Sequence, residues 1–250
     1  MTPRMSLPRP VLASLTAIAV LLGSAAAETS VEGLVIPLRE VVVASPARKP
    51  LVEIAVAEGD PVKAGQRLAR LDARTEEIDV ERLKKVLMSR EFDKKAGVGL
   101  RKEKIISEED ALDRELEYEI AKLQLAAAEA LLERTEIRAP MSGTVVDRYK
   151  EVGETPTDAE PLLRIIDTSK VFARIHLRRE QAFDLKTGET VQVDILFPRG
   201  KTLRTEGVVD FVSPEINADS GLRRAKVLID NAEGQITAGL RARVLLPAAP

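Results

Sequence analysis

Residues that could carry out catalysis are few in this 250-residue chain, which has no Cys, no Trp and one His. Without Cys it can have no disulfide, no thiolate zinc site, no iron–sulfur cluster and no cysteine nucleophile. A serine triad would need His176 as its general base, but the alternation of residues 171–177 places that side chain on the polar face of a strand. No Gly-x-Ser-x-Gly motif is present. We therefore expect no catalytic site and no enzyme activity.

Ligands for metals and surfaces for nucleic acid are also scarce. Met88 and Met141 have no Met or His nearby in the sequence, so thioether binding of copper lacks its ligands. No calcium-loop spacing occurs, although a structural ion held by carboxylates stays open. Aromatic residues make up 3% of the chain and its formal net charge is −2, which does not suit a stacking platform or a phosphate-binding surface. We expect no cofactor, no metal site and no nucleic-acid partner.

The first 27 residues have the layout of a secretory signal peptide. Arg4 and Arg9 precede an uncharged apolar run over residues 11–22, and Ala25-Ala26-Ala27 provides small residues for cleavage. No Cys follows this run, so a lipid anchor is not expected. We expect cleavage after Ala27 and a soluble mature protein on the far side of a membrane, with an uncleaved membrane anchor as the alternative.

Two β-like segments flank a helical one. Residues 31–72 and 137–247 alternate apolar and polar residues between Gly and Pro, whereas residues 73–136 contain no Pro and are rich in Glu, Lys, Leu and Ala. A shift of 94 residues superimposes Gly153 on Gly59 and Leu162 on Leu68. Two such halves predict a quasi-symmetric β-sandwich, split by an insertion whose ends meet. Turns or close backbone approach are expected at Gly59, Gly65, Gly143 and Gly239.

Because its two ends must meet, the insertion is predicted to be an antiparallel helical hairpin. Its first arm is expected from about Thr75 to Lys95, with a break at Gly97-Val98-Gly99. Ser107 and Asp110 form a capping-box pattern for the second arm, and each arm would be roughly 35–40 Å long. One apolar stripe of this arm is predicted to admit the partner helix closely: Leu112, Leu116, Ile120, Leu123, Ala127, Ala130 and Arg134.

Three motifs carry a family resemblance. They are Val56-x-Glu58-Gly59-Asp60-x-Val62-Lys63-x-Gly65-Gln66, then Thr135-x-Ile137-x-Ala139-Pro140-x-x-Gly143, then Asp230-Asn231-x-x-Gly234-x-Ile236-x-x-Gly239. In this order, around a helical hairpin, they resemble the periplasmic adaptor or membrane fusion protein family of bacterial efflux systems, the HlyD-like adaptors. The resemblance covers residues 31–247.

The resemblance implies a mainly β fold with an α-helical hairpin. A split lipoyl-like β-sandwich would carry the coiled-coil hairpin and be followed by a small β-barrel. The expected divisions are 1–27 (signal peptide), 28–48 (N-terminal strands shared with the barrel), 49–72 and 135–169 (the sandwich halves), 73–134 (hairpin) and 170–247 (barrel). No clear membrane-proximal domain is expected.

The same resemblance implies a non-catalytic periplasmic adaptor. Its expected partners are an inner-membrane transporter of RND or ABC type, a TolC-type outer-membrane channel and further copies of itself in a ring. The family's tip motif places Leu100 and Ser107 at the channel, with Ala96 where that motif has Arg, so Lys95 or Arg101 would supply the charge. The candidate partner-binding residues are Leu100, Arg101 and Ser107, and an N-cap alone would also explain Ser107.

A carrier domain of an enzyme complex is the alternative. Residues 139–145 also resemble biotinyl carriers, which present a modified Lys at a hairpin turn between Met residues. Here the helical insertion follows Leu71-Asp72, where that turn would be, and Lys170 has no Met on either side. The adaptor interpretation is therefore preferred.

Overall fold

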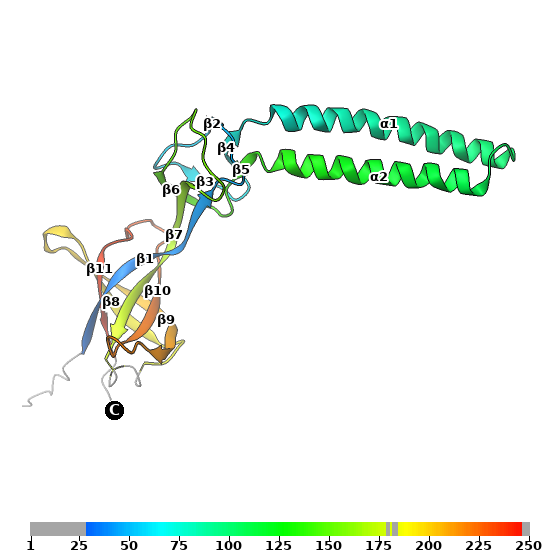
Figure 1. Ribbon diagram of the computed structural model, residues 1–250. Helices are drawn as coiled ribbons and strands as arrows, with labels where there is room; N and C mark the ends of the chain where they lie inside the picture. The colour runs from blue at the N-terminus through cyan, green and yellow to red at the C-terminus, as the bar shows by residue number, and fades with distance from the viewer. Residues whose placement is uncertain (1–28, 179–180, 182–184, 247–250) are drawn as a thin grey trace, which may run out of the picture.

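The structure is a computed structural model that describes residues 29–178, 181 and 185–246. Figure 1 shows a β-barrel, a smaller β-sandwich beside it, and a long helical hairpin that projects from the sandwich. The fold is thus mainly β with a helical hairpin, as predicted. The expected signal peptide, residues 1–27, lies outside the described residues.

The barrel is built from long antiparallel strands. It contains β1 (Ser30–Ala44), β7 (Pro161–Leu177), β8 (Thr190–Leu196), β9 (Thr202–Ile216), β10 (Arg223–Asp230) and β11 (Arg241–Leu245). A short 3₁₀ turn, η1 (Pro198–Gly200), joins β8 to β9. The strand order is β1-β11-β8-β9-β10-β7, and the pairing of β1 with β7 closes the barrel.

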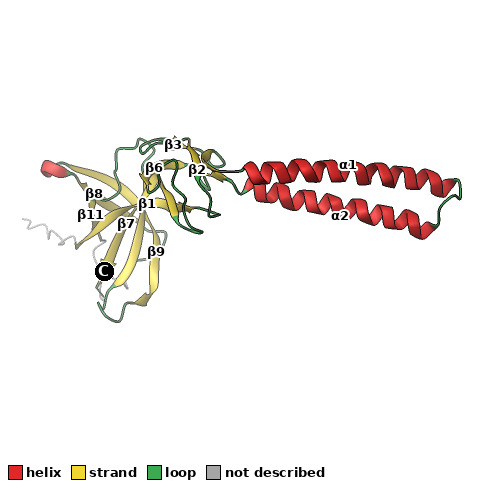
Figure 2. Ribbon diagram, turned by 45° about the horizontal axis from the view of Figure 1, so that its top comes forward, coloured by secondary structure: helices red, strands yellow, loops and turns green. Residues whose placement is uncertain are grey.

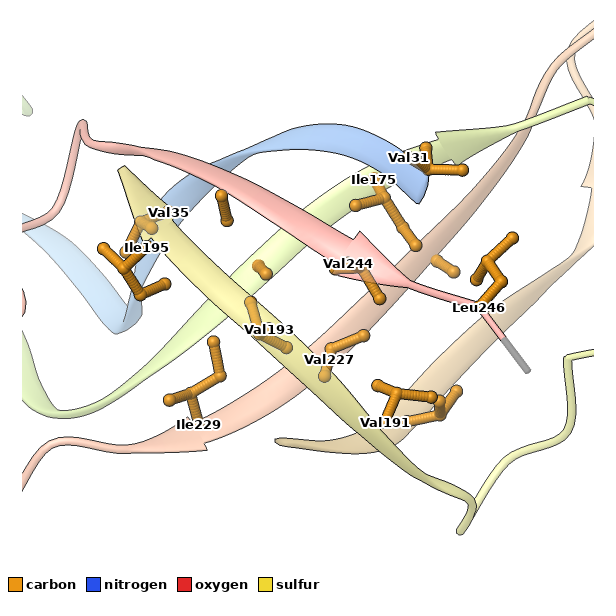
Figure 3. Close-up of a cluster of buried hydrophobic side chains, with 14 of the residues drawn as sticks. Val31, Val35, Ile175, Val191, Val193, Ile195, Val227, Ile229, Val244 and Leu246 are labelled. Atoms are coloured by element: carbon orange, nitrogen blue, oxygen red, sulfur yellow. The ribbon is translucent and has the colours of Figure 1, made fainter. Parts of the chain in front are cut away.

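Alternate residues of each barrel strand fill its interior. Ile175, Val193, Ile195, Val227 and Val244 are fully buried, and Figure 3 shows them converging from their strands. The intervening residues of these strands are more exposed. The barrel therefore has one continuous apolar core, and the burial of these side chains stabilises it.

The sandwich surrounds a second, separate core. Its strands are β2 (Leu51–Ile54), β3 (Pro61–Val62), β4 (Arg67–Leu71), β5 (Glu136–Arg138) and β6 (Gly143–Arg148). One sheet has the order β2-β4-β5, while β6 and β3 extend the sheet that contains β7. Leu68, Leu71, Val145 and Ile165 are buried between them. Each half of the sandwich supplies part of this core, so neither half is complete alone.

The predicted repeat is present in the hydrogen bonds. Gly59 donates its backbone N–H to Val145 over 2.8 Å, and Gly153, 94 residues later, donates to Leu51 over 2.8 Å. The partner positions differ by the same 94 residues. The two halves are therefore related by a pseudo-twofold arrangement, in which each one supplies the turn that closes the other.

Two glycines illustrate the expected conformational roles. Gly239 has φ +95° and donates its N–H to the carbonyl of Val35 at 2.8 Å. Gly143 is needed for close approach instead, because a Cβ there would lie 2.3 Å from the carbonyl oxygen of Ile166. Gly59 and Gly65 also have positive φ, so all four expectations are confirmed.

The hairpin consists of α1 (Arg74–Lys102) and α2 (Glu108–Glu133), which lie side by side along their length (Figure 2). The predicted break at Gly97-Val98-Gly99 is wrong, because α1 continues through it to Lys102. An interior glycine costs a helix about 1 kcal/mol, which cross-helix contacts can offset. Gly97 is buried against Arg114, where a Cβ would lie 2.8 Å from the side-chain Cδ.

Candidate functional site

The seam between the two helices differs from the predicted one. On α2 the buried residues are Ala121 and Ala128, and on α1 they are Val80 and Gly97. In heptad register with them, Tyr118 and other half-buried side chains line the rest of the contact. The seam is thus built from small and amphipathic side chains, which allow close approach of the helices.

The apolar stripe predicted to face the partner helix is exposed instead. Its exposed residues include Leu112, Leu116, Ile120 and Leu123, with 51–70% of their surface accessible. They lie about half a turn away from Ala121 and Ala128, which places them on the outer side of α2. A matching outer edge on α1 contains Ile78, Met88 and Phe92, with 63–72% exposed. The hairpin is therefore a two-helix ribbon with an apolar row along the outer edge of α2, and with exposed apolar side chains between charged ones such as Lys85 along the outer edge of α1.

Ion pairs connect the helices across the seam. Arg90 lies 3.0 Å from Glu117, and Lys94 lies 3.0 Å from Glu115, with its ammonium 4.6 Å from the ring centre of Tyr118. The hydrogen bond to Glu115 raises the pKa of Lys94. In these cross-helix pairs the cation belongs to α1 and the acid to α2. Because the side chains are partly exposed, each pair contributes at most about 1 kcal/mol and serves mainly to set the register.

The tip is a tight connection closed by a capping box. Ser107 Oγ accepts the backbone N–H of Asp110 at 3.0 Å, and Asp110 Oδ2 accepts the N–H of Ser107 at 3.2 Å. The hydrogen bonds from Ser107 hold the pKa of Asp110 below its usual value. At the other side of the turn the N–H of Ile105 donates to the carbonyl of Leu100 at 2.9 Å. The capping box predicted from the sequence is confirmed.

The candidate residues of the tip lie around this connection. Leu100 is half-buried in the last turn of α1, whereas Arg101 and Ser107 are exposed. Lys95, one of the two residues expected to replace the missing Arg, pairs with Glu91 along α1 at 2.6 Å. Arg101 is therefore the more available of the two cations.

At its base the hairpin is anchored to the sandwich by polar contacts. Lys49 forms an ion pair with Glu76 in the first turn of α1, and Arg134 donates to the carbonyl of Pro46 at 2.8 Å. Asp72 accepts hydrogen bonds from Arg74, and these lower the pKa of Asp72 to about 2. The arm therefore leaves the sandwich with several contacts at its root.

The described residues offer little that resembles a catalytic or metal centre. His176 is exposed on β7, opposite Arg224 of β10, in an open cleft that also contains Ser213 and Glu215. Within 29–178, 181 and 185–246, no group of three or more His, Asp or Glu side chains is placed to hold a metal ion. Over the same ranges, neither helix combines the length and the apolar character that a membrane crossing requires.

The carrier alternative is not favoured by the fold. The turn where a carrier domain would present its lysine lies between β4 and β5, and the whole hairpin is inserted there. Lys170 instead pairs with Asp230 in the register of β7 and β10.

The proteins with similar sequences have low identity to this chain, but one of the matches extends over most of its length. The chain is 23% identical over 227 residues to nodulation protein NolF of Rhizobium meliloti, covering 85% of this chain and 61% of that protein. It is 24% identical over 194 residues to the cation efflux system protein CzcB of an Alcaligenes species, covering 70% of this chain and 36% of that protein. The chain thus spans less than two thirds of the length of these relatives.

Two solved structures share this fold at low sequence identity. A MacA–MexA chimera that contains the α-hairpin domain of Pseudomonas aeruginosa MexA matches with a TM-score of 0.80 at 21% identity, covering 88% of this chain and 81% of that one. The membrane fusion protein Spr0693 of Streptococcus pneumoniae matches with a TM-score of 0.74 at 18% identity, covering 89% of this chain and 100% of that one.

Two family models cover almost the whole described chain. Residues 170–250 match the CusB-like β-barrel domain. Residues 39–172, more than half of the sequence, match the barrel-sandwich hybrid domain of RND membrane fusion proteins. The split sandwich, the inserted hairpin and the following barrel agree with these matches, and the chain belongs to the RND membrane fusion protein family.

Proposed function

We propose that this chain is the periplasmic adaptor of a multicomponent efflux or secretion system and bridges an inner-membrane transporter and an outer-membrane channel. The observation that carries the proposal is the hairpin itself: α1 has 29 residues, so the arm is about 43 Å long, and it projects from the sandwich (Figure 1). An arm of this length connects surfaces that a compact domain would not reach.

The parts of the chain divide this work between them. We assign 49–72 and 135–169 to the sandwich, 73–134 to the arm, and 170–247, together with the shared strand in 28–48, to the barrel. The barrel is the proposed contact with an inner-membrane pump of RND or ABC type. The family match and its relatives named as efflux proteins, such as CzcB, support the RND type. The adaptor acts by shape, without catalysis.

The tip is the proposed contact with a TolC-type channel. Leu100 would supply an apolar contact and Arg101 a charge, while Ser107 keeps the start of α2 in place through its capping box. The tip is rich in exposed charge, since Lys102, Glu103 and Lys104 follow Arg101. Such a surface suits recognition of an acidic or polar rim.

Self-association into a ring is supported by the two outer edges of the hairpin. A row of Leu and Ile on α2 and the exposed apolar side chains of α1, which include Met88 and Phe92, would each be covered if hairpins lay side by side. Because one edge of each copy would meet the other edge of the next, the contact would be heterologous, and we propose that the rotation between copies closes it into a ring.

The heights of the two edges match as well. Gly97 packs on Arg114 and Lys84 pairs with Glu129, so Met88 lies at about the level of Leu123 along the arm. Copies related by rotation alone would thus bring Met88 of one hairpin against Leu123 of its neighbour. The apolar side chains of the two edges would meet without an axial shift.

The bridging role is tested by export and by capture of both partners. A photocrosslinking residue in place of Arg101 should join the adaptor to an outer-membrane channel in its own host, whereas the same residue in place of Thr205 on the barrel should not. Deletion of residues 75–134 should abolish export while the remaining β protein folds. Export that survives this deletion would exclude the bridging role.

A further inference from the structure

In the part of the chain that the structure describes, two strands, β1 and β7, run from the barrel into the sandwich. All the strands from β2 to β6 belong to the sandwich and follow β1, and all those from β8 to β11 belong to the barrel and follow β7. β1 and β7 pair with each other in both parts, from Gly33 opposite Ile175 to Ala44 opposite Pro161. The orientation of the sandwich, and of the hairpin on it, therefore depends on this two-stranded ribbon.

The ribbon is irregular where it leaves the barrel. Pro37 pairs with Val171 and Arg39 pairs with Asp167, so three residues of β7 stand opposite the single residue Leu38 of β1. Such a bulge bends a ribbon and interrupts its ladder of hydrogen bonds. Without further support this point would be the weakest along the connection.

We call this irregular part of the ribbon, where β1 and β7 leave the barrel, the joint. On the side that faces the turn over residues 234–239, the joint is not covered by packed side chains. An open groove lies along the ribbon there, between Val146 of β6 and the turn over residues 234–239. Ile36, Ile166 and Ile236 line it from the ribbon and the turn. A groove between the two parts leaves room for one to tilt toward the other, so the rigidity of the joint must come from other contacts.

Asp167 ties the two strands together at the bulge. It is 7% exposed, and its carboxylate accepts from Arg39 Nη2 at 2.8 Å and from Ser169 Oγ at 2.7 Å and backbone N at 3.0 Å. Burial opposes the charged form, but the hydrogen bonds from Ser169 and Arg39 outweigh it and hold the pKa of Asp167 below its usual value. The charged carboxylate thus spans β1 and the extra residues of β7.

Asn231 ties the bulge to the barrel. Asn231 is buried, with 5% of its surface exposed. Its side-chain Nδ2 donates to the carbonyl of Thr168 at 2.8 Å and to that of Ile236 at 2.9 Å. Its Oδ1 accepts the N–H of Ile236 at 2.8 Å. The same turn reaches the other strand through Gly239, which donates to Val35 at 2.8 Å. The turn therefore holds both strands as they leave the barrel.

We propose that Asp167 and Asn231 are positioning residues, which together lock the joint between barrel and sandwich and so fix the direction of the hairpin. The lock does not depend on the adaptor role, but its use in aiming the tip rests on the proposed function. Over an arm of about 43 Å, a tilt of about 10° at the joint moves the tip by about 7 Å. A free joint would spread the tip over a range wider than a helix radius.

The experiment measures the joint directly by distances between spin labels. The sequence has no Cys, so Val52→Cys on β2 and Val208→Cys on β9, both exposed, can be labelled without background. The variants are Asn231→Ala, Asp167→Asn and Arg39→Gln. Asp194→Asn is the matched control: Asp194 pairs with Arg204 at 2.7 Å with similar exposure of both side chains, but between two strands of the barrel.

The expected result is a narrow distance distribution for the parent chain and for Asp194→Asn. The three joint variants should give about a twofold wider distribution or a second population. If Asn231→Ala fails to fold by circular dichroism, Arg39→Gln, which changes a largely exposed side chain, decides the question. Distributions as narrow as the parent in folded Asp167→Asn and Arg39→Gln would overturn the proposal. Since export is not part of the measurement, failure of the adaptor role leaves this result intact.

Discussion

Gly65 and Ala159 occupy equivalent turns of the two sandwich halves, 94 residues apart, and both have left-handed backbone, with φ +80° and +60°. Each donates its N–H to an equivalent carbonyl, Gly65 to Ala139 at 2.8 Å and Ala159 to Ser45 at 2.9 Å. The repeat therefore imposes the same backbone on two residues, and only one of them is a glycine.

Replacing Ala159 by Gly should stabilise the protein. Left-handed backbone costs a residue with a Cβ about 1–2 kcal/mol, and the greater freedom of Gly in the unfolded chain takes back part of this, so the gain is about 0.5–1 kcal/mol. Gly65→Ala should lower the free energy of unfolding by a similar amount, because a Cβ there meets nothing within 4 Å and the cost is only that of the left-handed backbone. Urea unfolding gives both values. Ala57→Gly, whose backbone is not left-handed, should destabilise, and a gain there would contradict the explanation.

The two glycines of α1 should respond differently to Ala. At Gly99 a Cβ meets nothing within 4 Å, so Gly99→Ala should stabilise the helix by about 1 kcal/mol. At Gly97 the Cβ would displace the side chain of Arg114, and Gly97→Ala should gain less. The melting temperatures of the variants are compared by following the helical circular dichroism signal during thermal unfolding. An equal gain at both positions would mean that Gly97 is not a packing residue.

The capping box should make the hairpin tip sensitive to acid. The pKa of Asp110 is lowered in the folded chain, chiefly by the hydrogen bond from Ser107. The ionised carboxylate therefore contributes its full stabilisation of the tip above the pKa of an unfolded Asp, about 3.9. This stabilisation is lost as the pH falls through the lower folded-state pKa. The protection of the amides at the start of α2, which is their exchange rate relative to the intrinsic rate at the same pH, should therefore fall below about pH 4. Asp110→Asn should remove this pH dependence, and a dependence unchanged in that variant would assign it elsewhere.

Two substitutions at Ser107 separate its structural role from docking. Ser107→Ala should destabilise α2 by about 1 kcal/mol through loss of the cap. Ser107→Asn keeps a side-chain oxygen that can cap the helix but changes the surface offered to a channel. If docking uses the hydroxyl directly, export falls in both variants. If export falls in Ser107→Ala alone, the serine acts through the helix start.

A disulfide between hairpin edges tests the ring. The double variant Met88→Cys with Leu123→Cys should give a ladder of covalent oligomers on oxidation, because each copy offers both edges to different neighbours. Arg90→Cys with Leu123→Cys is the control, because Arg90 lies at nearly the height of Met88 but pairs with Glu117 across the seam, away from the outer edge. A product that stops at the dimer would indicate a two-fold contact instead of a ring.

The sequence was a good guide to the repeat and a poor one to the helix contact. Equivalent glycines and leucines revealed the two sandwich halves, because turns and core positions demand particular residue types at fixed spacing. The seam was predicted wrongly because its residues Ala121, Ala128 and Tyr118 form a weak apolar pattern. The stronger pattern of Leu112, Leu116 and Ile120 lies on the outer edge. Hydrophobic periodicity identifies a buried face but not the partner that buries it.

The roles of Asn231 and Asp167 could not be read from sequence either. Asn231 stood out as part of a motif, but its contacts join residues 63 positions apart, and Asp167 meets Arg39 over 128 positions. A local sequence pattern does not predict which distant strand or bulge a polar side chain will contact. Such long-range polar contacts become visible only when the strands are in register.

The long pairing of β1 with β7 sets an order for folding. Gly33 and Ile175 are neighbours in space but 142 residues apart in the chain, so β1 has no partner until β7 has been made. The hairpin needs only local contacts and can close first, bringing the ends of the insertion together. Barrel and sandwich share β1 and β7, so they should then complete in one cooperative step, and a chain truncated before β7 should leave both parts unfolded.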